Sequence, residues 1–139
     1  MLLIYMKKLG EGLSCSSKSE AIGEMVYIKS VDDVIKLFDD AKGKICLVDD
    51  AGTTTLGPIL SDLTGVICTT GAAGSHLAIV SREYGLPCIM NVKIAANKLT
   101  LNGKKVKIAT EGEDKGIIFL LEWFITSIYI IVFNIYEPF

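Results

Sequence analysis

The chain has 139 residues and a net charge of −2 at pH 7, and 50% of its residues are hydrophobic. This length fits one domain whose core is large enough to fold without disulfides or a structural metal. No basic arm or cluster of lysine and arginine is present, which argues against a general nucleic-acid binder.

Cysteine usage and the N-terminus together predict a cytoplasmic protein. The four cysteines form no Cys-x-x-Cys pair and the single histidine is not near one, so the sequence predicts no zinc site. Single cysteines inside apolar runs are typical core residues of proteins in a reducing compartment. In Met1 to Lys8 the charges follow the apolar residues, whereas a signal peptide has the reverse order.

The first part of the chain predicts a loop, a strand, a helix and a second strand. Gly10 to Ser19 is rich in glycine and serine and is interpreted as a loop. Glu24 to Ile28 predicts a short strand, and a helix follows over Val31 to Phe38 with Ser30 as its N-cap. Ile45 to Val48 is a continuous apolar run, which is typical of a strand buried on both faces.

The middle of the chain repeats this alternation. Thr53 to Leu63 predicts a loop and a helix with Pro58 near its start, and Val66 to Cys68 predicts another buried strand. His76 to Tyr84 predicts a helix because apolar residues recur on one of its faces, and Gly85 ends it as a C-terminal cap.

The last predicted elements are strands. Cys88 to Met90 predicts a third buried strand, and Gly116 to Phe119 a final one. Asn102-Gly103 lies between the strand-like runs Leu99 to Leu101 and Val106 to Ile108, which is a strong hairpin signal. Buried strands that alternate with helices predict an α/β fold: a compact domain with buried strands, covering helices and a late β-hairpin.

The segment from Ile117 to Tyr136 is almost entirely aliphatic and aromatic. About twenty apolar residues can span a bilayer, so this segment is a candidate membrane anchor. Glu122 argues against that role, because a charge near the membrane centre costs about 2.5–3.5 kcal/mol on insertion scales; the alternative is a strand with a docking helix or interface element. We place the domain at residues 1–119 and expect the tail, residues 120–139, to stay out of its sheet.

A histidine follows a loop of small residues between a predicted strand and a predicted helix. From Gly71 to Ser75 the small side chains let an anion approach the backbone, and the helix N-terminus offers free N–H groups and partial positive charge. The same field favours a neutral His76 imidazole, whose lone pair can act as a nucleophile. The alternative is a structural histidine whose hydrogen bonds are satisfied at the helix start.

Other catalytic signatures are missing from the sequence. Ser75 is flanked by Gly74 and His76, so there is no Gly-x-Ser-x-Gly elbow, and no Walker A lysine follows Gly74. Asp49 and Asp50 are neighbouring carboxylates, which point to opposite faces of a strand. We therefore expect these two side chains in solvent rather than on a metal.

The stretch from Cys68 to Met90 resembles the phosphohistidine motif of phosphoenolpyruvate-utilising enzymes, a family that includes phosphoenolpyruvate synthase, pyruvate phosphate dikinase and rifampicin phosphotransferase. The family pattern is Thr-x-x-Gly-Gly-x-Thr-Ser/Cys-His-x-Ala-Ile-x-Ala-Arg-Glu-x-Gly-Ile-Pro-Ala-Val. The positions that match it are Gly71, Ser75, His76, Ala78, Ile79, Arg82, Glu83, Gly85 and Pro87. The likeness extends over roughly Gly10 to Phe119.

Four positions depart from the family pattern. Ala72 stands in place of its second glycine and Gly74 in place of its threonine, which narrows the loop and removes a hydroxyl that could bond a phosphate. Cys68 replaces the leading threonine, and Asn91 replaces a glycine after the strand.

The resemblance implies a swivelling domain that carries a phosphoryl group on His76. It also implies a set of phosphate-binding and supporting residues, which are Gly71, Gly74, Ser75 and Arg82. An alternative for Arg82 is a surface ion pair with Glu83 or a neighbour. In the family, an ATP-grasp domain phosphorylates the histidine, and the mobile domain then swings to a second site where pyruvate or another acceptor takes the phosphate.

Neither an ATP-grasp domain nor a phosphoenolpyruvate-binding domain fits into this chain. The resemblance therefore implies that such partner domains act in trans, or that the chain is a fragment or a decayed copy. We expect no cofactor on this domain itself, with ATP and Mg²⁺ bound only by a partner. Two alternatives remain: a non-catalytic interaction module, tethered to a membrane by its tail, and a ligand-binding domain in which His76 only donates a hydrogen bond.

Overall fold

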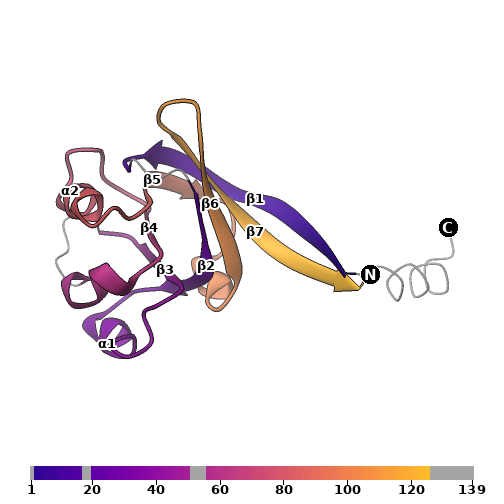
Figure 1. The fold of residues 1–139 in the computed structure, drawn as a ribbon, viewed down its shortest axis with the longest axis horizontal. Helices are drawn as coiled ribbons and strands as arrows, with labels where there is room; N and C mark the ends of the chain where they lie inside the picture. Colours follow the sequence, from indigo (N-terminus) through magenta and orange to yellow (C-terminus); the bar gives the residue numbers. More distant parts are fainter. Residues whose placement is uncertain (1, 17–19, 51–55, 126–139) are drawn as a thin grey trace, which may run out of the picture.

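The computed structural model describes residues 2–16, 20–50 and 56–125. In these residues seven strands close into a barrel in the order β1-β5-β4-β3-β2-β6-β7, with both α-helices on one side (Figure 1). The strands are β1 Leu2–Ser14, β2 Glu20–Tyr27, β3 Lys44–Val48, β4 Gly65–Cys68, β5 Cys88–Ile94, β6 Lys105–Glu111 and β7 Lys115–Ile125. The helices are α1 Val31–Ile35 and α2 His76–Glu83, and the 3-10 helices are η1 Gly57–Asp62 and η2 Lys98–Leu101.

The central strands β2 to β5 are parallel. Of these, β4 and all of β3 after Lys44 are buried on both faces, as their apolar runs predict. Along β3, Ile45 and Leu47 face the barrel interior, whereas Cys46 and Val48 pack against the helical layer. All four side chains are at most 3% exposed. Because each face has its own core, these strands need apolar residues at every position rather than at alternate ones.

The fold class agrees with the α/β expectation only in this parallel half. There α1, η1 and α2 connect successive strands and cover the outer face of the sheet (Figure 1). The helices are short, and β1, β6 and β7 complete the barrel through antiparallel pairing. The domain is therefore a strand-rich mixed fold with few helices.

The predicted glycine-rich loop over Gly10 to Ser19 is wrong for Gly10 to Ser14, which belong to strand β1, whereas Cys15 and Ser16 lie outside any strand and residues 17–19 lie outside the described residues. Leu2–Ser14 forms one strand, which pairs with both β5 and β7 and has register shifts after Lys8 and Glu11. Gly10 and Gly12 lie where β1 passes close to the backbone of β5. Glycine here serves the close approach of two strands, a use that is easily mistaken for a loop.

The late hairpin forms, but not where Asn102-Gly103 predicted it. Lys98–Leu101 is a 3-10 helix, and the side chain of Asn102 accepts a hydrogen bond from the backbone N–H of Tyr27 at 2.6 Å. The turn at Asn102-Gly103 thus binds to β2, and it does not connect two strands of a hairpin, because the segment before it is a 3-10 helix. The hairpin is formed by β6 and β7, with Glu111 paired to Lys115 around Gly112, whose φ is 63°.

Strand β7 crosses the boundary that the sequence analysis drew at Phe119. Leu120 pairs with Val106 of β6, and the ladder with β1 continues to Ile125. The prediction that the tail stays out of the sheet is therefore wrong for residues 120–125. Residues 126–139, which hold the rest of the candidate anchor, lie outside the described residues.

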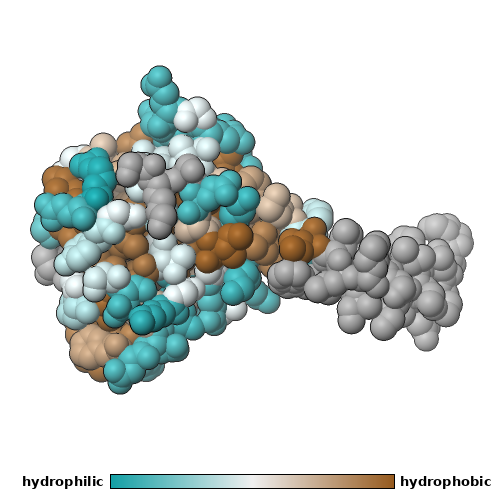
Figure 2. All heavy atoms as spheres, in the orientation of Figure 1, coloured by the Kyte–Doolittle hydropathy of each residue, from teal (hydrophilic) through white to brown (hydrophobic). Residues whose placement is uncertain are grey.

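Beyond the barrel, β1 and β7 continue as a two-stranded ribbon (Figure 1). Ile4 and Met6 of this ribbon are about half exposed, and Figure 2 shows hydrophobic surface where it leaves the barrel. No helix in the described part of the chain combines the length and apolar content needed to cross a membrane.

Candidate functional site

The four parallel strands place their carboxyl ends at one edge of the barrel. The loop from Thr69 to Ser75 leaves β4 at this edge and leads into α2. Segments that follow β2, β3 and β5 meet at the same edge. Ligand sites of parallel sheets lie at such edges, because loops from several strands converge there.

His76 is the first residue of α2, and its side chain is exposed, as predicted. Ser75 before it is the N-cap in an extended conformation. The first turn of a helix has backbone N–H groups without partners in the helix, and it carries partial positive charge. The imidazole therefore projects from a position where an added phosphoryl group meets favourable charge.

The loop before His76 (Thr69 to Ser75), which we call the phosphohistidine loop after the family motif that it resembles, makes a tight turn. Gly71 has φ 84°, in the left-handed region that glycine adopts most readily. The backbone N–H of Ala72 donates to Oγ of Ser75 at 2.9 Å, and the N–H of Ser75 donates to the carbonyl of Ala72 at 3.0 Å. Ser75 is thus the N-cap by position, but its hydroxyl bonds within the loop and does not cap a helix N–H.

Arg82 lies near the end of α2 and reaches back to the loop. Its Nη2 donates to the carbonyl oxygen of Ala73 at 2.9 Å. The predicted site residues on the loop are therefore contiguous with His76, and Arg82 joins them through a backbone carbonyl. This contact takes the place of the ion pair with Glu83 that was the alternative for Arg82.

The end of α2 is well determined by its own sequence. Gly85 has φ 67°, and its N–H donates to the carbonyl of Arg82. The N–H of Leu86 donates to the carbonyl of Ser81, which completes the pair of bonds of a Schellman motif. Leu77 and Ala78 on the inner face are at most 2% exposed, so the helix is held both by its ends and by its buried face.

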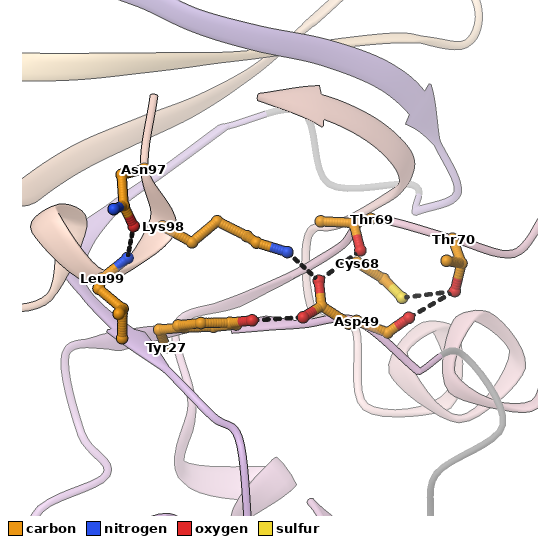
Figure 3. Close-up of polar contacts among 8 residues, drawn as sticks. All are labelled: Tyr27, Asp49, Cys68, Thr69, Thr70, Asn97, Lys98 and Leu99. Carbon is orange, nitrogen blue, oxygen red and sulfur yellow. Dashed lines mark hydrogen bonds and ion pairs between the residues drawn. The ribbon is translucent and has the colours of Figure 1, made fainter. Parts of the chain in front are cut away.

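The start of the phosphohistidine loop is bonded to Asp49 (Figure 3). As expected from the sequence, Asp50 is exposed, and the Asp49 side chain is 44% exposed, but it is also hydrogen-bonded to several neighbours. Oδ1 of Asp49 accepts from the Thr69 hydroxyl at 2.6 Å and from Nζ of Lys98 at 2.7 Å. Oδ2 accepts from the Tyr27 hydroxyl, and the backbone carbonyl accepts from the Thr70 hydroxyl at 2.7 Å. We call these five residues the Asp49 cluster.

The hydrogen bonds of the cluster determine the charge of its members. Burial raises the pKa of Asp49, but bonds from Lys98, Thr69 and Tyr27 outweigh burial and lower the pKa from 3.8 to about 2. The hydrogen bond to Asp49 raises the pKa of Tyr27 and the pKa of Lys98. The stability that Asp49 contributes is therefore fully present above its unfolded pKa and is lost as the pH falls through about 2.

A cavity of about 530 Å³ lies beside the Asp49 cluster. Tyr27, Asp49 and Lys98 form part of its wall, together with Lys29, Ser30 and Leu99. Across the described ranges no group of three or more histidine, cysteine, aspartate or glutamate side chains could hold a metal ion.

The segment that contains this site matches a known protein family. The model of the PEP-utilising enzyme mobile domain matches residues 40–112, which hold the parallel strands β3 to β5, the phosphohistidine loop and α2. The chain belongs to the PEP-utilising enzyme mobile domain family.

Curated relatives of this mobile domain are much longer proteins. Rifampicin phosphotransferase of Bacillus subtilis is 36% identical over 56 residues, which are 40% of this chain and 6% of that protein. Phosphoenolpyruvate synthase of Pyrococcus furiosus is 29% identical over 96 residues, which are 69% of this chain and 11% of that protein. Among solved structures, the N-terminal domain of Enzyme 1 - Nitrogen is 29% identical, with a TM-score of 0.43 over 59% of this chain and 37% of that one.

The structure explains one departure from the family pattern. Asn91, which stands where the pattern has glycine, has φ 52° and is the only described non-glycine residue with a positive φ. Asparagine enters the left-handed region more readily than other residues with a side chain. Its backbone N–H donates to the carbonyl of Thr70 at 3.0 Å, so this conformation helps to hold the phosphohistidine loop.

Gly74 and Gly71 are expected to respond oppositely to substitution by threonine. A Cβ at Gly74 would meet no atom within 4 Å, and Gly74 has no positive φ. Gly74→Thr restores the family hydroxyl. We expect its free energy of unfolding to lie within about 0.5 kcal/mol of that of the unmodified chain, or slightly above it. Gly71→Thr should lower the free energy of unfolding by about 1–2 kcal/mol, because the left-handed conformation is strained for threonine.

Urea denaturation of both variants beside the unmodified chain measures this difference. Equal losses in the two variants would show that backbone conformation does not distinguish the two glycines.

Proposed function

We propose that this chain is a phosphotransfer domain that accepts a phosphoryl group on His76 and passes it to an acceptor. The donor is a nucleotide or phosphoenolpyruvate bound by a partner domain, and the acceptor is a small molecule such as pyruvate. The observation that carries the proposal is the exposed imidazole on the first residue of α2, at the end of a glycine-turned loop. Membership of the PEP-utilising mobile domain family supports it.

Each transfer exchanges one bond to phosphorus for another. An imidazole nitrogen of His76 attacks the phosphorus of the donor, and the phosphorus–oxygen bond to the leaving group breaks, with the electron pair going to that oxygen. In the second transfer an acceptor oxygen attacks, and the imidazole leaves with the electron pair of the nitrogen–phosphorus bond. The role of this domain is to present one nucleophile to two different sites in turn.

The surroundings of His76 suit both states of such a carrier. The free imidazole is exposed and can reach a partner. After phosphorylation, the added negative charge lies at the N-terminus of α2, where unpaired N–H groups and the helix dipole favour it. The approach to this position is free of large side chains, because Gly71, Gly74 and Ser75 are small. Arg82 stabilises the loop through its hydrogen bond to the carbonyl of Ala73. ATP and Mg²⁺ are assigned to the partner that supplies the phosphoryl group.

The proposal is tested by labelling the chain and examining the chemistry of the label. Phosphoramidate, a small donor that phosphorylates imidazoles without an enzyme, is incubated with the chain, and a second incubation uses radiolabelled phosphoenolpyruvate or ATP with candidate partner domains. We expect one phosphoryl group per chain by intact mass, stable in base and lost in acid. A chain that takes up no label from any of these donors would instead favour an interaction or ligand-binding module that has kept the fold.

A further inference from the structure

Asp49 connects the phosphohistidine loop to two segments that are distant in the sequence. Tyr27 ends β2 and Lys98 begins η2, and both bind the carboxylate of Asp49. The hydroxyls of Thr69 and Thr70 bind the same residue from the loop. One aspartate, directly after β3, thus binds side chains from three other segments at the carboxyl edge of the barrel: the end of β2, the loop after β4 and η2 (Figure 3).

The rest of the loop has little to hold it. Gly71 to Gly74 are exposed, and their hydrogen bonds with other described residues are the Ala72–Ser75 bonds within the loop and the Arg82 bond to Ala73. The start of the loop is therefore where the barrel restrains it, through Asp49 and through the backbone bond from Asn91 to Thr70.

We propose that Asp49 is a positioning residue for the phosphohistidine loop. Its carboxylate and carbonyl hold Thr69 and Thr70, and the loop so anchored delivers His76 to a phosphoryl donor in one orientation. Correct orientation of a nucleophile accelerates its reaction because the ordering has been completed before the reactants meet. This inference rests on the proposed function, since it concerns the reactivity of His76.

The four residues bonded to Asp49 explain why an acidic residue is suited to this position. A carboxylate has two oxygens that accept several hydrogen bonds together, and charged acceptors form the stronger ones. Here Oδ1 takes two donors and Oδ2 takes one, while Lys98 balances the charge. Asparagine would keep the shape of the side chain but replace one acceptor oxygen with an NH₂ donor, which faces either the Tyr27 hydroxyl or Lys98.

The test compares phosphoramidate labelling of His76 in matched variants that are shown to be folded. Asp49→Asn should label about tenfold more slowly, and Thr69→Val about threefold more slowly, than the unmodified chain. Thr69→Ser keeps the hydroxyl and should restore the rate. Thr64→Val is the control for the loss of a threonine hydroxyl, because Thr64 precedes β4 at the opposite end of the strand.

Amide hydrogen exchange gives a readout that does not depend on labelling. In Asp49→Asn and Thr69→Val the amides of Ala72 and Asn91 should exchange faster, whereas the amide of Ile67 inside the sheet should not change. Wild-type labelling rates in both variants would overturn the proposal. If neither the unmodified chain nor any variant takes up label, the proposed function is overturned and the positioning role of Asp49 is judged from hydrogen exchange alone. Unchanged exchange at Asn91 in the variants would then overturn that role as well. If Asp49→Asn does not fold, the Thr69 pair decides.

Discussion

Replacing His76 with alanine is expected to abolish the acid-labile label completely. His76 is the only histidine in the chain, so no other imidazole can form a phosphoramidate. A phosphoryl group on imidazole leaves readily once the ring is protonated in acid, whereas a phosphate ester on serine does not. The label should therefore be base-stable and acid-labile in the unmodified chain and absent in His76→Ala, as measured by filter-bound radioactivity after acid and base treatment.

Ser75 supplies the control for this experiment. It is the neighbouring nucleophile, but its hydroxyl already accepts the N–H of Ala72 and no second histidine is present to act as its base. Ser75→Ala removes one hydrogen bond of the loop, so we expect labelling to slow by about fivefold for a bond of about 1 kcal/mol, with unchanged acid lability. Acid-stable label that persists in His76→Ala would assign the nucleophile to serine instead.

His76→Ala should leave the stability of the domain almost unchanged. The side chain is exposed, and substitutions of exposed residues usually alter the free energy of unfolding by no more than about 0.5 kcal/mol. A urea unfolding curve that matches the unmodified chain will show that the lost label reflects lost chemistry and not a lost fold.

Alanine at Gly10 or Gly12 is expected to have the largest effect on stability. A Cβ at Gly10 would collide with the carbonyl oxygen of Lys93 and lie 3.1 Å from its carbonyl carbon. A Cβ at Gly12 would collide with the carbonyl oxygen of Met90 and lie 2.9 Å from Cγ2 of Val92. These neighbours are mostly backbone atoms of β5, which cannot rotate away, so we expect each variant to lose about 3 kcal/mol or more of unfolding free energy.

Gly57→Ala is the matched control for these two variants. Gly57 begins η1, its φ is not positive, and a Cβ there would meet no atom within 4 Å. Its unfolding free energy should stay the same or rise by up to about 1 kcal/mol, because alanine reduces the entropy of the unfolded chain. If Gly10→Ala and Gly12→Ala unfold at the same urea concentration as Gly57→Ala, then β1 does not pass β5 as closely as described.

Local signals in the sequence were sufficient for the site of the proposed chemistry. The apolar run Val66 to Cys68 becomes β4, and the helix predicted from His76 to Tyr84 becomes α2, which is shorter by one residue at its end. Gly85 caps that helix as predicted, with φ 67°. These features depend on residues close together in the chain: a short apolar run, small residues in a turn, and a glycine after the last helical turn.

Features that depend on distant partners were missed or misplaced. Glycines in β1 looked like a loop because their role is to let the backbone of β5 approach, and a close approach leaves no local pattern. Asn102-Gly103 gave a hairpin signal, but the side chain of Asn102 bonds to Tyr27 of β2, 75 residues away in the sequence. The end of the sheet was placed six residues too early, since the β1 ladder that extends β7 to Ile125 joins opposite ends of the described chain.

The sequence alone determined that His76 follows a small-residue loop and begins a helix, because that arrangement is local and resembles a known motif. Only the tertiary structure revealed what holds the loop. The sequence indicated that Asp49 and Asp50 meet solvent, and both do in part, but it gave no sign that parallel packing of β2, β3 and β4 brings Tyr27 and Thr69 to the Asp49 carboxylate or that η2 adds Lys98. A carboxylate's role depends on which donors surround it, and here those donors come from segments that only the closed barrel brings together.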